Sequence, residues 1–377
     1  ASESAQFIVQ NLNLNAGALQ FQGNYQDIGK GFSAQKMLGA QPGLDASLLQ
    51  RWEQEKGLKR YDYTLGLALG GSTLQQSVLR IQDDKGAIEQ RGYLLQSHAL
   101  QLRYERREAQ AGFERFKDLS DAAKGDWQRE RGLVREQLES TLKLAPNSTL
   151  QFNQTQVAQE GAEIKRQQYA FNLPWLKLVR THQSVEQGFT RFGDLAEADK
   201  AQLAREVGMQ RDQTQIEIHQ KGVRVAAEEG IVRSPSGTLE RESLQIKTDQ
   251  VEVEHLRRAV DADFKNLPNL TPAEHQKMVE EVRQFHAPQE TLKPEDVPQA
   301  LKEPGLERTL QRIEIKPGKE MSLQVKRFEV ADRVGELDPA PVESSAIASD
   351  GGIAGVHRVD GVAAGGRGGD VRLRRVL

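Results

Sequence analysis

The sequence contains no cysteine. A disulfide framework, a catalytic thiol and a cysteine-ligated metal are therefore excluded. The absence is compatible with the surface or envelope of a bacterium, which is where we expect the protein to reside.

An excess of charge of one sign is also missing. The 51 basic and 54 acidic residues are intermixed and leave a net charge of -3. A nucleic-acid-binding domain concentrates basic residues on one face, so we expect no nucleic-acid partner. Hydrophobic residues make up only 37% of the chain, which predicts a thin core.

Long apolar runs are absent as well. No run approaches the ~20 residues of a membrane-spanning helix, so we expect none. The chain begins at Ala1 without a charged-then-apolar leader, so we expect no signal peptide within this sequence. We expect that a signal was removed or that a longer protein contains this sequence.

Catalytic and cofactor motifs are not found. The sequence has no Gly-x-Ser-x-Gly, no phosphate loop and no Gly-x-Gly-x-x-Gly. Acidic pairs such as Glu280-Glu281 are interpreted as solvated. No histidine pair has metal-ligand spacing, so we expect no metal, no cofactor and no enzymatic activity; the histidines are His98, His182, His219, His255, His275, His286 and His357.

One motif is present four times. Its clearest copies are Gly112–Leu119 and Gly188–Leu195; Asp263–Leu270 keeps the apolar positions, and a degenerate copy runs from Gly31 to Leu38. Because the aromatic and aliphatic positions persist while the charges change, the motif predicts a buried turn that joins a strand to a helix.

Two independent landmarks give the same period. The phenylalanines Phe113, Phe189 and Phe264 are spaced by 76 and 75 residues, and the glycines that end the predicted helices, Gly57, Gly132 and Gly208, by 75 and 76. This agreement indicates an internal repeat.

A helix follows each copy of the motif. Its central large apolar residue lies about two turns past the closing leucine in the last three copies, so both face one side. Thr271 and Glu274 form a predicted capping box, and Ser120 is the equivalent cap. The structural motif comprises Phe113, Phe116, Leu119, Phe189, Phe192, Leu195, Phe264, Leu267, Leu270, Trp52, Trp127, Leu203 and Met278.

Four strands with alternating apolar residues fill each period. Their short connections predict antiparallel neighbours in a meander. The predicted fold is a β-rich α+β repeat array of about 16 strands, in which a four-stranded meander is followed by one amphipathic helix every 75–76 residues. The predicted segments are a partial repeat 1–57, repeats 58–132, 133–208 and 209–286, a Pro-rich linker 287–304, a hairpin 305–332 and a disordered tail 333–377.

The alternative fold is a 16-stranded antiparallel β-barrel with helical loop insertions. Each strand shows only two or three alternating apolar residues before charge: Leu176 and Leu178, for example, are followed on the same face by Arg180 and His182. Three alternate positions cover about 13 Å, against the ~25 Å apolar band of a membrane barrel. We therefore favour a sheet whose narrow apolar stripe is covered by the helices.

The function expected from this fold is structural. Repeats without catalytic residues are typical of scaffolds, spacers and adhesive surfaces, with neighbouring repeats of the same longer protein or other envelope components as partners. An outer-membrane barrel acting as a pore or anchor is the alternative, which leaves membrane contact open. An enzyme with an unrecognised site is the second alternative.

A single substitution tests the motif. Phe189→Ala should lower the free energy of unfolding by ~3–5 kcal/mol if the ring is buried, because the cavity adds to the lost transfer free energy. Urea denaturation measures the change, and a loss below about 1 kcal/mol would place the ring on the surface.

Overall fold

The computed structural model describes residues 6–33, 36, 45–119, 121–285, 304–318, 321–332, 346–350, 353–357 and 370–375. The chain divides into two compact units. Unit 1 contains residues 1–167 and 188–196, and unit 2 contains residues 168–187 and 197–377. The Ser120 cap, the insertion around residues 39–43 and most of the linker 287–304 lie outside the described residues.

Unit 1 is an antiparallel meander in which each strand pairs with the next. Its strands are β1 (Phe7–Ala16), β2 (Leu19–Ile28), β3 (Lys59–Leu69), β4 (Ser72–Gln82), β5 (Ala87–Gln96), β6 (Leu100–Ala109), β7 (Leu133–Ala145) and β8 (Ser148–Gln159). Strand β9 (Ala162–Leu173) has residues in both units.

Unit 2 follows the same plan. Its strands are β10 (Leu176–Val185), β11 (Gln210–Gln220), β12 (Val223–Ser234), β13 (Gly237–Lys247), β14 (Val251–Val260), β15 (Leu306–Gly318) and β16 (Met321–Asp332). The predicted β-rich meander array is therefore confirmed.

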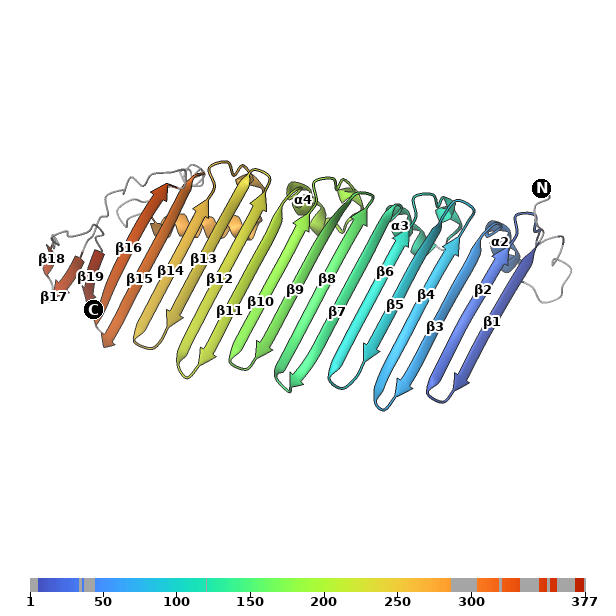
Figure 1. The fold of residues 1–377 in the computed structure, drawn as a ribbon, viewed down its shortest axis with the longest axis horizontal. Coiled ribbons are helices and arrows are strands. Elements are labelled where there is room, and N and C mark those ends of the chain that lie inside the picture. Colours follow the sequence, from blue (N-terminus) through green and yellow to red (C-terminus); the bar gives the residue numbers. More distant parts are fainter. Residues whose placement is uncertain are drawn as a thin grey trace. The chain divides into compact units, whose positions relative to one another are not determined.

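Short helices interrupt the meander at intervals of four strands, after β2, β6, β10 and β14, at the end of the strands opposite the tight turns (Figure 1). They are α2 (Ala46–Gln54), α3 (Asp121–Arg129), α4 (Glu197–Arg205) and α5 (Pro272–Phe285). The turns η1 (Arg115–Asp118), η2 (Phe192–Asp194) and η3 (Leu267–Asn269) lead into α3, α4 and α5.

The predicted barrel alternative is wrong, because the sheet is not closed. Within unit 1, β1 pairs with β2 over its whole length, from Phe7↔Ile28 to Ala16↔Leu19. Closure would require the first strand to pair along its second edge as well.

Sequence reasoning placed the strand ends less well. The first strands of the repeats were expected at Tyr61–Leu69, Ser140–Leu144 and Gln215–His219, whereas β3, β7 and β11 begin earlier, directly after each helix. The opening residues of β3 and β11 are charged or polar and carry little β-signal of their own, and in β7 the charged Arg135 and Glu136 follow Leu133 and Val134. They become strand because the neighbouring strand supplies backbone partners.

The tail also differs from the expectation. Residues 333–377 were predicted without regular structure, but three short strands lie within this range: β17 (Ala346–Asp350), β18 (Ile353–His357) and β19 (Asp370–Arg375). Strand β17 pairs with β18, and β19 pairs with β16. In β19, Val371 and Leu373 alternate with charged residues, the period expected of a strand.

The repeat motif lies in the core of each unit. In unit 1, Phe113, Phe116 and Trp127 form one cluster with Ile81, Ile88 and Ala109 of the sheet. In unit 2, Phe264, Leu270 and Met278 form a cluster with Val232, Leu239 and Val260. Phe189, Leu195 and Leu203 are buried, and Trp52, Leu119, Phe192 and Leu267 are partly buried.

In the Gly112–Leu119 copy of the motif, glycine precedes Phe113 because two backbones meet there. A Cβ on Gly112 would lie 2.2 Å from the Lys85 carbonyl oxygen, and one on Gly86 would lie 2.6 Å from the Phe113 nitrogen. No side chain fits either position. Gly112 and Phe113 therefore lie in close backbone contact with the turn at Lys85 and Gly86.

The motif arginines have a role that the sequence did not show. Because Asn266 stands in the third copy, the sequence predicts that the fold does not require the charge of Arg115 and Arg191. Arg115 donates to the carbonyl oxygens of Lys56 and Gln54 at 2.7 and 2.8 Å. Arg191 does the same to residues at the end of α3, so in unit 1 each arginine satisfies the carbonyls of the preceding helix.

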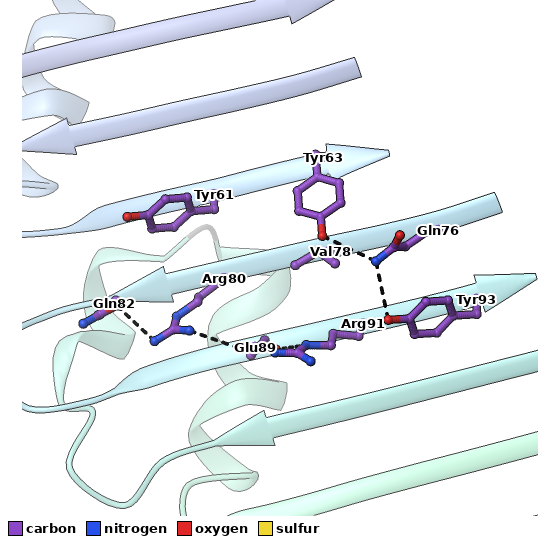
Figure 2. Close-up of a pocket in the computed structure, with 9 residues that line it drawn as sticks. All are labelled: Tyr61, Tyr63, Gln76, Val78, Arg80, Gln82, Glu89, Arg91 and Tyr93. Atoms are coloured by element: carbon purple, nitrogen blue, oxygen red, sulfur yellow. Dashed lines mark hydrogen bonds and ion pairs between the residues drawn. The ribbon is translucent and has the colours of Figure 1, made fainter. Parts of the chain in front are cut away.

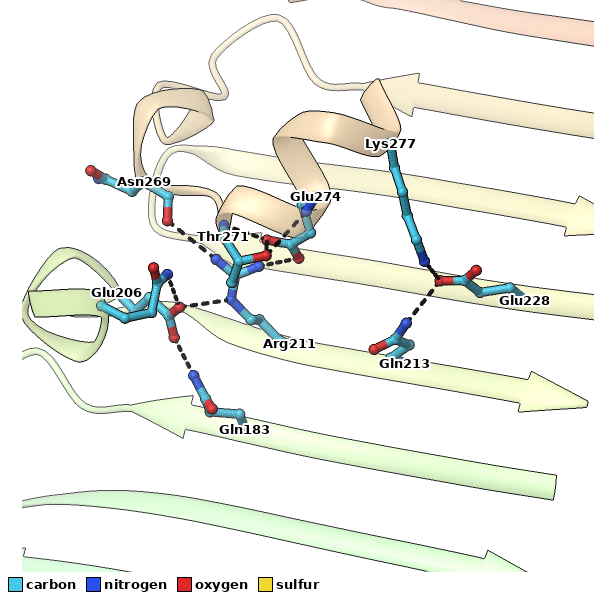
Figure 3. A network of polar contacts seen from close by, with 10 residues as sticks. Gln183, Glu206, Arg211, Gln213, Glu228, Asn269, Thr271, Glu274 and Lys277 are labelled. Atoms are coloured by element: carbon cyan, nitrogen blue, oxygen red, sulfur yellow. Dashed lines mark hydrogen bonds and ion pairs between the residues drawn. The ribbon is translucent and has the colours of Figure 1, made fainter. Parts of the chain in front are cut away.

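The capping box at the start of α5 is present as predicted. The Thr271 backbone nitrogen donates to the Glu274 carboxylate at 2.7 Å, and the Glu274 nitrogen donates to the Thr271 hydroxyl at 3.2 Å. Glu274 also pairs with Arg211 on β11, which ties the helix start to the sheet (Figure 3).

Four glutamates near the helix ends are buried against the sheet. They are Glu55, Glu130, Glu206 and Glu281, 75, 76 and 75 residues apart. Each glutamate contacts a polar residue at the same position of the strand that precedes its helix. These residues are Gln26 on β2, Arg107 on β6, Gln183 on β10 and Arg258 on β14. We call each contact a glutamate clamp.

The clamps extend to the next strand. Arg135 and Arg211, which are directly paired with Arg107 and Gln183, lie 3.0 Å from Glu130 and 3.4 Å from Glu206. Burial raises the pKa of Glu130, while Arg107 and Arg135 oppose that rise. Figure 3 shows Glu206 between Gln183 and Arg211. Glu281 is only 3% exposed, so its interpretation as a solvated residue is wrong.

Neighbouring glutamates on α5 provide a matched test of the clamp. Glu281→Gln should lower the free energy of unfolding by about 3–5 kcal/mol, because it removes the charge that Arg241 and Arg258 share in a buried site. Glu280→Gln, at an exposed position, should change it by less than about 0.5 kcal/mol. Equal effects in urea denaturation would contradict the clamp.

Candidate binding surface

A row of aliphatic side chains crosses seven consecutive strands of unit 2, from β10 to β16. Each member is directly paired with the next, which places all of them on one face of the sheet. The row, here called the unit 2 ladder, is Leu176, Ile218, Val225, Ile246, Val253, Ile313 and Val325. At ~4.8 Å per strand the ladder is about 29 Å long.

Unit 1 carries a corresponding row. The unit 1 ladder is Leu19, Leu67, Leu74, Leu95 and Leu102, directly paired from β2 to β6. The apolar surface continues on the same face through a second paired row, which starts on β6 two residues closer to the tight turns than Leu102. This row consists of Leu100, Leu142 on β7 and Leu150 on β8.

The ladders are not covered. None of their members is buried, and Leu74 and Ile313 are 45% and 41% exposed. Other large side chains on the ladder face are also exposed, including Leu14, Leu69 and Leu150 in unit 1 and Val223 and Ile315 in unit 2. Solvent-exposed apolar side chains gathered in a strip of this kind mark interaction surfaces.

The helices pack on the opposite face. Ladder residues Leu74, Leu95 and Leu102 are each seven positions from a residue of the unit 1 core cluster, Ile81, Ile88 and Ala109. In unit 2, Val225, Ile246 and Val253 are likewise seven positions from Val232, Leu239 and Val260. An odd separation in a strand means opposite faces. The expectation that the helices cover the apolar stripe is therefore wrong.

Ion pairs border the ladders toward the helix ends of the strands. In unit 1, Arg106 lies 2.9 Å from Glu108 and 3.4 Å from Glu136. In unit 2, Arg257 lies within 4 Å of three carboxylates, those of Glu307, Glu242 and Glu240. The ladder face thus changes from aliphatic to charged within about four residues of strand.

His182 belongs to this charged region. Its Nδ1 lies 2.9 Å from the Asp212 carboxylate, which also accepts a hydrogen bond from Arg233 at 2.6 Å. Burial alone would raise the pKa of Asp212, but the hydrogen bonds from His182 and Arg233 outweigh it and hold the pKa below its ordinary value. The cluster is a salt-bridged triad rather than a metal site.

A shallow depression lies at the border between ladder and charge in unit 1. It has a volume of about 460 Å³ and is formed by β3, β4 and β5 (Figure 2). Gln76 lies between two tyrosines and donates to the hydroxyls of Tyr63 and Tyr93 at 3.4 Å each. On the other side Glu89 pairs with both Arg80 and Arg91.

The predicted motif residues do not converge on this surface. All of them lie in the buried turns and helices or pack against them on the helix face. In the part of the chain that the structure describes, no group of three or more histidines and carboxylates could hold a metal ion. None of the helices searched there has the length and apolarity needed to cross a membrane.

Sequence reasoning missed the ladders and the clamps for different reasons. The apolar alternation of each strand was visible, but the register that aligns strands comes only from their pairing. The clamp did leave a signal, because Glu55, Glu130, Glu206 and Glu281 follow the same period as the motif. An alignment of polar as well as apolar positions would have found it.

Comparison with known proteins gives no further assignment: no protein-family model matches the chain, and a search of curated proteins returned no match.

The triad predicts a pH dependence for unit 2. The folded-state pKa of Asp212 is depressed, so its stabilisation is present above the unfolded pKa of 3.8 and is lost as the pH falls through the folded value. Unfolding free energy measured from pH ~6 to ~3 should therefore decrease less steeply in Asp212→Asn than in the wild type. Parallel curves would contradict this role.

Proposed function

We propose that this chain is a non-enzymatic structural and binding scaffold of a bacterial surface or envelope, and that each unit presents its ladder face to an apolar partner. The observation that carries the proposal is the pair of ladders, directly paired aliphatic rows left uncovered on the face opposite the helices. A scaffold needs a firm sheet and a presented surface, and this arrangement offers both.

The energetics favour a binding role for the ladder face. Burying apolar surface stabilises a complex by roughly 25 cal/mol per Å². The ladders leave this free energy unused, because the helices and the motif phenylalanines bury the other face. A partner that covers the ladder face would gain it.

The ionisable groups support a non-catalytic role. Glu130 is held by Arg107 and Arg135. Burial opposes ionisation of Glu228, but Lys277 and Arg241 lower its pKa overall. Both carboxylates face permanent positive charges on the sheet and helices, which is the pattern of structural ion pairs rather than of a general acid or base.

Two directly paired positions on each face of β12 and β13 test the proposal. Val225→Thr with Ile246→Thr should weaken binding of a polarity-sensitive naphthalene dye about threefold, since two ladder positions lose apolar surface. Threonine keeps the β-branched shape, so the unfolding free energy should change by less than about 1 kcal/mol.

The matched control lies on the opposite face of the same strands. Arg224→Thr with Lys247→Thr changes the adjacent paired residues and should leave dye fluorescence unchanged. If the two double variants behave alike, or if neither changes dye binding, the ladder face is not the binding surface.

A further inference from the structure

We propose that unit 1 binds a long-chain carboxylate, with the carboxylate in the depression between Gln76 and Glu89 and the hydrocarbon tail on the unit 1 ladder. This inference rests on the proposed function, because it names the class of molecule that covers one ladder. It adds a head-group site that an apolar surface alone does not require.

The depression adjoins the ladder through two strands. Leu74 and Gln76 are neighbours on the same face of β4, as are Leu95 and Tyr93 on β5. A ligand seated between the tyrosines is therefore in line with Leu74 and Leu95. Val78 and the two tyrosine rings form its apolar wall (Figure 2).

The charge of the depression is complementary to one anion. Arg80 lies 3.6 Å from Glu89, and Arg91 pairs with the same carboxylate, so two guanidinium groups share one acid. The Arg106 cluster has the reverse ratio, one arginine between two carboxylates. Guanidinium groups bind carboxylates through charge-assisted hydrogen bonds.

The polar groups around the depression can complete the site. The Gln76 amide donates to the hydroxyl oxygens of Tyr63 and Tyr93, so both hydroxyls accept hydrogen bonds from Gln76. Each hydroxyl can therefore donate its own proton to a ligand oxygen. Arg91 is 46% exposed in its side chain and reaches solvent from the same face. The site therefore offers hydroxyl and guanidinium donors at its edge.

The ladder suits an elongated tail better than a compact group. Its five leucines extend for about 19 Å across the strands, whereas each strand adds only two or three apolar positions along its own length. The surface is a strip and not a pocket. An extended hydrocarbon chain has the matching shape.

Calorimetry with a ligand series below the micelle concentration tests the inference on the full chain. Decanoate, dodecanoate and tetradecanoate should bind with affinity rising about twofold per methylene, half of the full transfer effect because the face is open. Dodecan-1-ol, with the same tail and no charge, should bind about tenfold more weakly than dodecanoate.

Paired variants separate head from tail. Arg80→Gln with Arg91→Gln should weaken dodecanoate about tenfold and leave the alcohol unchanged, while Arg103→Gln, from an Arg–Glu pair on the opposite face, should change neither. Leu74→Thr with Leu95→Thr should weaken both ligands, whereas Leu94→Thr on the opposite face should not.

Each of three calorimetric outcomes would overturn the inference, and a fourth outcome comes from sedimentation. The three are equal binding of acid and alcohol, dodecanoate binding that is unchanged in the arginine variants, and no dodecanoate binding. Sedimentation measures the oligomeric state. If the wild type is a dimer and the double variant Leu74→Thr with Leu95→Thr is a monomer, a second copy of the chain covers the ladder and the inference is wrong. The dye experiment tests the proposed function separately. If Val225→Thr with Ile246→Thr still weakens dye binding, the proposed function is retained although the carboxylate inference is wrong. If dye binding is unchanged, the proposed function is also wrong.

Discussion

The buried glutamate at the end of each helix is the contact on which the rest of the structure depends. Helices of nine residues such as α3 and α4 present too little apolar surface to dock firmly by burial alone. A carboxylate near a helix C-terminus is also disfavoured by the helix dipole. The clamp opposes both effects, because Gln26, Arg107, Gln183 and Arg258 on the sheet each contact one of the four carboxylates.

Once the helices are fixed on one face, the other face is free for a different purpose. The strands are long enough to use each face over a different half of their length. Near the helices, residues such as Ile88 and Val232 are buried on the helix face. Near the tight turns, residues such as Leu95 and Val225 are presented on the opposite face. The proposed binding scaffold follows from this division.

Much of the fold could be predicted from the sequence. The meander and the capping box at Thr271 depend on local signals, and the structure contains both. The candidate surface could not be predicted, because Leu74 and Leu95 are distant in the chain and only strand register pairs them. The same holds for Arg115, whose partners lie at the end of the preceding helix, 59 residues away for Lys56.

The sequence by itself determined which residues alternate, where the chain turns and where α5 starts, because these depend on neighbours within a few positions. Only the tertiary structure decided which face the helices occupy and which apolar rows stay exposed. The physical reason is a matter of phase. Leu74 and Ile81 lie seven positions apart on β4, so their side chains point to opposite faces of the sheet. Ile81 faces the helices and Leu74 faces solvent. Strand pairing places the partners of each residue on the same face as that residue.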